Sequence, residues 1–119
     1  MNRLAPGSLL GQLAPANTTA ATLVAARTNF RAAITSVVIC NTTGTAATCR
    51  LFHDVGGSTY VASNALLYDV SVAANTTLIL ESGLNEDGLN LAPADTLGCR
   101  TGTNNALTFS AYGVIQEAR

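Results

Sequence analysis

Side chains that could do chemistry are few in this chain of 119 residues, and they are widely spaced. Its single histidine, His53, precedes Asp54, and an imidazole beside a carboxylate is part of the arrangement that activates a nucleophile in hydrolases. The nearest hydroxyl and thiol groups are neighbours of this pair in sequence only; they are Ser58, Ser63 and Cys49. We therefore interpret His53 as a strand-end histidine, at the surface or in an interface, and predict no catalytic residue and no enzyme.

Three acidic side chains form the only other cluster of candidate ligands. Glu86, Asp87 and Asp95 carry the oxygen ligands that a hard cation such as Ca²⁺ prefers. Their spacing matches no calcium-binding loop, and we interpret them as part of a solvated acidic loop. The sequence predicts no metal site and no cofactor.

The three cysteines, Cys40, Cys49 and Cys99, match no zinc-binding spacing. Free cysteines often serve as small buried hydrophobic residues, and this is the interpretation we favour. Cys40 and Cys49 flank a turn at residues 41–48 and are expected on adjacent strands of a hairpin, where a cross-strand disulfide would fit. Cys99 could pair with either of them, and a leftover thiol could bridge to another chain.

Charge is scarce, which indicates surface buried against other chains. Charged residues make up 11% of the chain, against about 25% in a typical soluble domain, and depletion of charge is typical of interface cores. Lysine is absent, and arginine suits interfaces because it keeps its charge when partly buried. The net charge of −1 argues against an electrostatic nucleic-acid binder. The candidate interface residues are Leu9, Leu10, Arg27, Arg31, Arg50 and Arg100.

These residues must be positioned by a chain that repeats one kind of segment. A short apolar or alternating run is followed by a turn rich in Thr, Asn and Gly, and then by another run, a pattern typical of antiparallel β-domains. We predict an all-β fold, an antiparallel and jelly-roll-like β-sandwich of about eight strands. The runs are residues 33–41, 47–54, 59–72, 76–81, 95–101 and 106–116, and residues 18–26 are predicted as a further strand.

The ends and loops of the chain differ from these runs. Residues 1–16 contain Pro6, Gly7, Gly11 and Pro15, and we predict an extended N-terminal arm, with at most one short strand at residues 8–13, before a sandwich domain at residues 17–119. Residues 82–94 are predicted to form the most protruding loop. Two glycines inside predicted strands, at positions 98 and 113, indicate close backbone approach, for which a neighbouring chain is one explanation. No apolar run is long enough for a membrane span, and no secretory signal is recognisable at the start.

Part of the chain resembles a known family. Residues 34–51, ITSVVICNTTGTAATCRL, look like a recurrent strand–turn–strand element of small virion proteins of tailed bacteriophages. The resemblance continues through the YDV of residues 68–70, the ANTTL of residues 74–78 and the FSAYG of residues 109–113, and it spans residues 18–116. It implies a β-sandwich subunit of the virion, either a capsid decoration protein or a neck, collar or tail component, acting as a trimer or larger ring.

Together these observations predict a structural protein rather than an enzyme. We expect a capsid decoration or cement protein, located in the virion and made in the host cytoplasm, that binds copies of itself, with a trimer favoured, and the major capsid protein. Nucleic acid and membranes are not expected partners. The alternatives are a neck, collar or tail-fibre component, and a host-glycan-binding module that uses the loop at residues 82–94. A hydrolase based on His53 is the weakest hypothesis.

Overall fold

The computed structural model describes residues 8–81 and 89–117, which contain nine strands and one short 3-10 helix. The described part of the chain holds no helix with the length and apolar character of a membrane-spanning segment. The elements are β1 (Ser8–Leu13), β2 (Ala21–Ala25), β3 (Phe30–Asn41), β4 (Ala47–Asp54), η1 (Ala62–Asn64), β5 (Ala65–Val72), β6 (Thr77–Glu81), β7 (Leu89–Leu91), β8 (Thr96–Thr101) and β9 (Leu107–Glu117).

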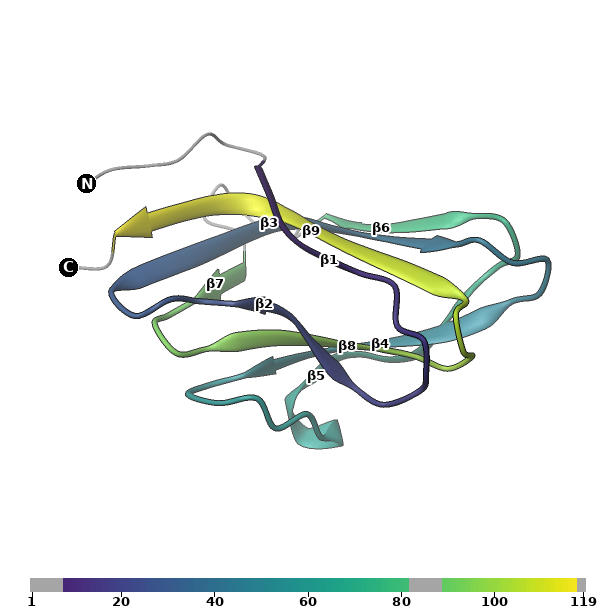
Figure 1. Cartoon of the computed structure of the whole chain (residues 1–119), viewed down its shortest axis with the longest axis horizontal. Helices are drawn as coiled ribbons and strands as arrows, with labels where there is room; N and C mark the ends of the chain where they lie inside the picture. Colours follow the sequence, from purple (N-terminus) through teal and green to yellow (C-terminus); the bar gives the residue numbers. More distant parts are fainter. Residues whose placement is uncertain (1–7, 82–88, 118–119) are drawn as a thin grey trace.

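The strands form two antiparallel sheets packed face to face (Figure 1). Sheet A has the order β1-β9-β3-β6, with β7 also paired to β3, and sheet B has the order β2-β8-β4-β5. The first half of the chain pairs with the second half in reverse order, β1 with β9, β2 with β8, β3 with β6 and β7, and β4 with β5. Because alternate pairs lie in opposite sheets, this long ribbon closes into a jelly roll, which confirms the predicted fold class.

β6 and β7 lie end to end beside β3 and together take the place of one strand. The nine described strands therefore fill eight strand positions in the sandwich. β6 pairs with β3 from Ser36 onward and β7 pairs with it as far as Ile34, so that only Thr35 lies between the two pairings. The same residue forms a bulge in the pairing of β3 with β9. The prediction of one loop at residues 82–94 is therefore wrong for β7, whose Leu91 is fully buried. Residues 82–88 lie outside the described residues.

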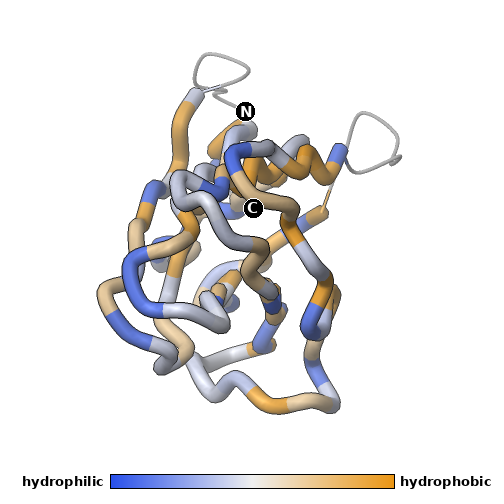
Figure 2. Tube along the Cα trace, turned by 90° about the vertical axis from the view of Figure 1, so that its right-hand side faces the viewer, coloured by the Kyte–Doolittle hydropathy of each residue, from blue (hydrophilic) through white to orange (hydrophobic). Residues whose placement is uncertain are grey.

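Alternation along the strands sends one apolar set into the space between the sheets. Apolar and polar segments follow each other along the trace in Figure 2, and the fully buried side chains include Ile39, Leu51, Leu97 and Phe109 from both sheets. Burying a side chain of this size contributes about 1.5–3 kcal/mol. β3 is apolar on both faces, so that Val38 and Cys40 point outward while Val37 and Ile39 point into the core.

The structure corrects two predictions about the ends of strands. The N-terminal arm was predicted for residues 1–16, with a short strand at residues 8–13; that strand is confirmed, but it belongs to the sandwich, because it pairs with β9 as an edge strand of sheet A. Residues 1–7 lie outside the described residues. Cys40 and Cys49 were expected on one hairpin, but β3 lies in sheet A and β4 in sheet B. The turn between them crosses from one sheet to the other, because a jelly roll pairs each of these strands with a distant partner instead.

A buried asparagine fixes that crossing. Asn41 is 1% exposed, and its Nδ2 donates to the backbone oxygens of Thr45 at 2.9 Å and Val72 at 3.0 Å. Its Oδ1 accepts from the backbone nitrogen of Thr43 at 2.9 Å and from the Thr43 hydroxyl at 2.8 Å. The side chain thereby satisfies backbone groups that leave the sheets where the chain changes layer.

The two strand glycines make close contacts within the chain itself. A Cβ on Gly113 would meet the carbonyl oxygen of Ala33, and a Cβ on Gly98 would lie 2.5 Å from the ring of Tyr60. The Tyr60 ring lies on the outer side of sheet B, stacked on Phe52 at 5.6 Å between centroids, and its hydroxyl donates to Thr96 at 2.8 Å. The expected contact of these glycines with a neighbouring chain is not needed to explain them.

We predict that Gly98→Ala destabilises the protein by about 1–3 kcal/mol, because the added methyl group must displace the Tyr60 ring or the strand beneath it. Urea unfolding gives the free energy, and Gly44→Ala is the matched control, since a Cβ at Gly44 meets nothing within 4 Å. Equal stability of the two variants would contradict the packing role of Tyr60. In the background Tyr60→Ala the cost of Gly98→Ala should largely disappear.

Candidate functional site

The middle of the outer face of sheet A carries little charge, and Arg31 lies beyond it toward one end of β3. Cross-strand register places three rows of side chains on this middle part, and Glu81 is the one acidic or basic residue among them. We call this set the sheet A face; it consists of Leu9, Gln12, Ser36, Val38, Cys40, Thr77, Ile79, Glu81, Thr108, Ser110 and Tyr112.

Apolar side chains are exposed across this face. Ile79 is 58% exposed on β6 and Leu9 is 50% exposed on β1, at opposite edges of the sheet. Val38 and Cys40 lie half-buried between them on β3. Four strands about 4.8 Å apart and three rows about 7 Å apart give an area on the order of 400 Å², which is about half of the roughly 800 Å² that each partner buries in a standard interface.

The outer face of sheet B carries charge instead, and a bulge in β5 organises it. Cys49 pairs with Val70 and Leu51 pairs with Leu67, so Tyr68 and Asp69 together lie opposite the single residue Arg50. Asp69 adopts a left-handed backbone conformation with φ 55°. Two residues facing one is the geometry that re-aims side chains at sheet edges, and here both turn toward the arginine.

Arg50 is held by both of these neighbours. Its Nε donates to Oδ1 of Asp69 at 2.7 Å and its Nη2 donates to Oδ2 at 3.0 Å. The guanidinium carbon lies 3.8 Å from the centroid of the Tyr68 ring. The hydrogen bonds between the two side chains raise the pKa of Arg50 and lower the pKa of Asp69.

Arg100 completes this cluster from the neighbouring strand. It pairs directly with Arg50 across β4 and β8, and its Nη1 lies 3.9 Å from Oδ1 of Asp69. Its Nε donates to the backbone oxygen of Thr18 at 2.7 Å. We call Arg50, Tyr68, Asp69 and Arg100 the arginine cluster. The sequence marked the two arginines as interface candidates, but nothing in it indicated that they are paired or that Asp69 lies between them.

His53 has a structural partner that the sequence analysis missed. Its Nε2 lies 3.2 Å from Oδ2 of Asp95, not near Asp54, and this is its one side-chain hydrogen bond in the described part of the chain. Asp95 is 5% exposed and also accepts from the backbone nitrogens of Gly56 and Ala92, both at 3.1 Å. Burial acts to raise the pKa of Asp95, but the hydrogen bonds from His53, Ala92 and Gly56 outweigh it and lower the pKa. The pair therefore ties the ends of β4 and β8 together.

The interpretation of Asp95 as part of a solvated acidic loop is wrong, because its side chain is buried and holds three hydrogen bonds. Glu86 and Asp87 lie outside the described residues, and Asp95 is engaged as above. Among residues 8–81 and 89–117, no group of three or more His, Cys, Asp or Glu side chains is arranged to hold a metal ion.

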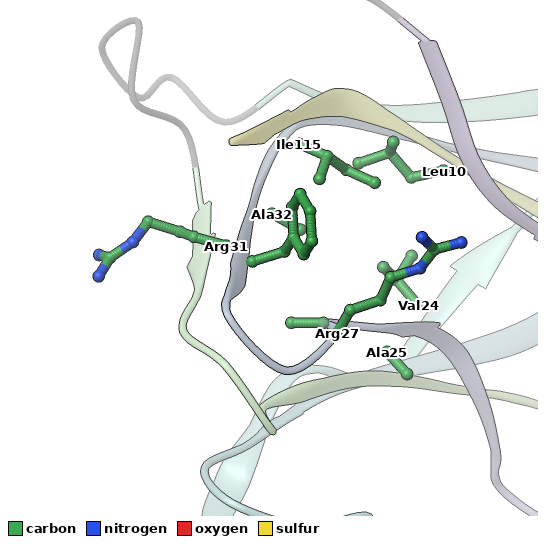
Figure 3. Close-up of a pocket in the computed structure, with 9 residues that line it drawn as sticks. Leu10, Val24, Ala25, Arg27, Arg31, Ala32 and Ile115 are labelled. Atoms are coloured by element: carbon green, nitrogen blue, oxygen red, sulfur yellow. The ribbon is translucent and has the colours of Figure 1, made fainter. Parts of the chain in front are cut away.

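Arg27 and Arg31 lie at one end of the sandwich, beside a small cavity of about 140 Å³ (Figure 3). Leu10 and Ile115 border the cavity on the sheet A side, and Val24 lies on the β2 side. Figure 3 shows the Arg27 side chain running along the cavity and Arg31 pointing away from it. These two arginines are far from the arginine cluster in the fold, so the candidate interface residues do not form one patch.

The three cysteines are free thiols in distinct environments. Cys49 and Cys99 are fully buried in the core, where burial raises the pKa of Cys49 to about 11 and that of Cys99 to about 12. Cys40 is half-buried on the sheet A face. Of the three, Cys40 is the thiol placed to contact another chain, which keeps the predicted inter-chain role open for it alone.

Comparisons with known proteins give weak matches. No protein-family model and no curated protein matches this chain. Two structures of infectious bursal disease virus, the Gx strain and the T13 viral particle, align with 96% of this chain at TM-score 0.49, with 14% and 12% identity. This chain covers 31% and 30% of the length of those chains. The Anabaena sensory rhodopsin transducer aligns with 79% of this chain and 83% of its own length at TM-score 0.32 and 14% identity. Scores of this size carry no conclusion about what the chain does.

We predict that Asp95→Asn lowers the free energy of unfolding by about 1–3 kcal/mol near neutral pH, because one of three buried donors loses its acceptor. A carboxyl whose pKa is lowered by folding stabilises the fold above its unfolded pKa of 3.8, and this contribution is lost as the pH falls through the lower folded value. The difference in free energy of unfolding between wild type and Asp95→Asn should therefore become smaller as the pH is lowered from about 7 to about 3. Urea unfolding at both pH values measures it.

Glu81→Gln is the control, since it removes the same charge from an exposed side chain and should change stability by less than about 0.5 kcal/mol. A difference between wild type and Asp95→Asn that does not depend on pH would show that the Asp95 charge contributes nothing to folding.

We predict that one thiol per folded chain reacts rapidly with a water-soluble disulfide reagent at neutral pH. The thiolate is the reactive form, and burial with raised pKa values keeps Cys49 and Cys99 protonated. Mass spectrometry should locate the label on Cys40, and Cys40→Ser should abolish the fast phase. Rapid labelling of Cys49 or Cys99 in the folded protein would contradict the burial described here.

Proposed function

We propose that this chain is a structural subunit of a virus particle, a decoration or cement protein of a tailed-bacteriophage capsid, that binds its neighbours through the sheet A face. The main support for this proposal is that the sheet A face has little charge and exposes apolar side chains. The jelly roll is an architecture that viral capsid domains use, and the resemblance of residues 34–51 to small phage virion proteins supports the choice of virus class.

The outer side of β3 supplies the apolar part of this contact surface. Val38 and Cys40 point away from the core, so the strand at the centre of sheet A carries apolar side chains toward solvent. A face of this kind gains free energy when another surface excludes water from it, at about 25 cal/mol per Å² of apolar surface. Glu81 is the one charged residue of the sheet A face, so shape complementarity and apolar contact, rather than charge, determine which partners bind to it.

The partners of this face are copies of the same chain and the major capsid protein. We favour a trimer. In it, the sheet A face of each subunit packs either against the neighbouring subunit of the trimer or against the seam between capsid subunits. A neck, collar or tail component would use the same face. Dissociating the particle and finding which part retains the protein would distinguish these positions. In this proposal no catalytic step, cofactor or nucleic acid takes part.

We predict that Ile79→Lys weakens binding to particles lacking the protein at least tenfold, because it places a charge in a desolvated contact. The measurement is co-sedimentation of the purified chain with such particles. Val55→Lys is the control, since Val55 is 76% exposed on a turn away from the sheet A face and the substitution is chemically comparable. Thermal unfolding of both variants should match the wild type.

Labelling of Cys40 gives a second readout of the same proposal. If the sheet A face is covered on the particle, the thiol should react several-fold more slowly there than in the free subunit. If Ile79→Lys binds particles with wild-type affinity and the labelling rate of Cys40 is the same on the particle as in the free subunit, the interface does not involve the sheet A face. Failure of the wild-type chain to bind any virion substructure would overturn the proposed function.

A further inference from the structure

The arginine cluster places two like charges directly opposite each other. Arg50 and Arg100 are cross-strand partners on β4 and β8, and both side chains lie on the outer face of sheet B. Like charges in this position destabilise a sheet unless something compensates them. Their presence together on the solvent side of a chain with few charges therefore calls for an anionic partner.

Asp69 provides only part of that compensation. It accepts two hydrogen bonds from Arg50, but the nearest nitrogen of Arg100 is 3.9 Å away, beyond hydrogen-bond length. Arg100 uses its Nε for the backbone oxygen of Thr18, and its Nη1 and Nη2 have no hydrogen-bond acceptor among the described residues. Two guanidinium groups and one carboxylate leave a formal charge of +1.

The geometry of the cluster is fixed before any ligand arrives. The β5 bulge turns Tyr68 and Asp69 onto Arg50, and Thr18 fixes the plane of the Arg100 guanidinium. Ordering flexible side chains is a main cost of binding, and it is small here because these side chains are already held. The cluster is also partly accessible, since the side chains of Arg50 and Arg100 are 22% and 26% exposed and that of Asp69 is 46% exposed.

We infer that the arginine cluster is a docking site for one carboxylate side chain of a partner protein. The terminal nitrogens of Arg100 form a planar pair of donors that matches the two oxygens of a carboxylate. A single negative charge neutralises the cluster, whereas a doubly charged phosphate would face Asp69 with an excess of negative charge. This inference deepens the proposed function, since the acidic residue belongs to a neighbouring virion subunit, and it adds a contact on the side of the sandwich opposite the sheet A face.

The test of the site itself uses acetate as the probe on the purified chain. The Nε–Hε resonances of the arginines are followed by NMR at fixed ionic strength while acetate replaces chloride. The Arg50 and Arg100 signals should shift with saturation, and those of Arg31, whose side chain points away into solvent, should drift only linearly (Figure 3). Inorganic phosphate is the second arm, and it should give a weaker response at the same two residues.

Arg100→Gln should raise the apparent dissociation constant for acetate at least fivefold, while Ser58→Glu, which changes the net charge by the same amount at an exposed turn, should leave it unchanged. Equal shifts at Arg31, Arg50 and Arg100 would overturn the inference, because the ions would then act through general screening. Stronger binding of phosphate than of acetate would overturn the choice of carboxylate.

The same two variants separate this inference from the proposed function. In co-sedimentation with particles lacking the protein, Arg100→Gln should bind at least fivefold more weakly than Ser58→Glu. Normal particle binding of Arg100→Gln would reject the docking role and leave the proposed function intact. If the chain binds acetate saturably but binds no particle, the acetate site would stand and the proposed function would be rejected.

Discussion

The fold depends on satisfying backbone polar groups wherever the chain passes from one sheet to the other. A jelly roll changes layer repeatedly, and each passage takes peptide groups out of a ladder at the rim of an apolar core. Three of the buried polar side chains lie at such passages: Asn41 between β3 and β4, Asp95 between β7 and β8, and Thr101 between β8 and β9, where its hydroxyl donates to the oxygen of Thr103 at 2.7 Å. The described part of the molecule leaves no buried side-chain polar atom without a partner.

With the interior closed in this way, the two outer faces are free to differ. Sheet A presents a neutral face because its central strands carry small or apolar residues on both sides. On sheet B the Tyr60 ring covers Gly98, and the arginine cluster lies in the next row, two residues along β8 at Arg100. The two faces therefore differ in how salt acts on them, since screening weakens electrostatic interactions at the arginine cluster and leaves apolar burial at the sheet A face largely unaffected.

Local pattern in the sequence predicts the strands well and their pairing poorly. The alternating runs predict β4 as residues 47–54, because side-chain periodicity and turn residues are properties of neighbours in the chain. The short β7 owes its structure to β3, which is remote in sequence, so Pro and Gly nearby suggested a loop instead. The strand at residues 8–13 was predicted, but its place beside β9 was not. For the same reason the partnership of His53 with Asp95, and of both arginines with Asp69, could not be inferred: no periodicity records which strands become neighbours.

The pairing of β1 and β3 with β9 has a consequence for synthesis of the protein. β9 is the last of the described strands in sequence and the neighbour of both β1 and β3, so sheet A cannot close until β9 has been made. Until then the twelve residues of β3 lack the partner with which they form their longest ladder. Contacts so distant in sequence slow folding, and an uncovered apolar strand invites pairing with other nascent chains. The yield of folded protein should therefore depend on how quickly β3 finds β9, as well as on the stability of the finished fold.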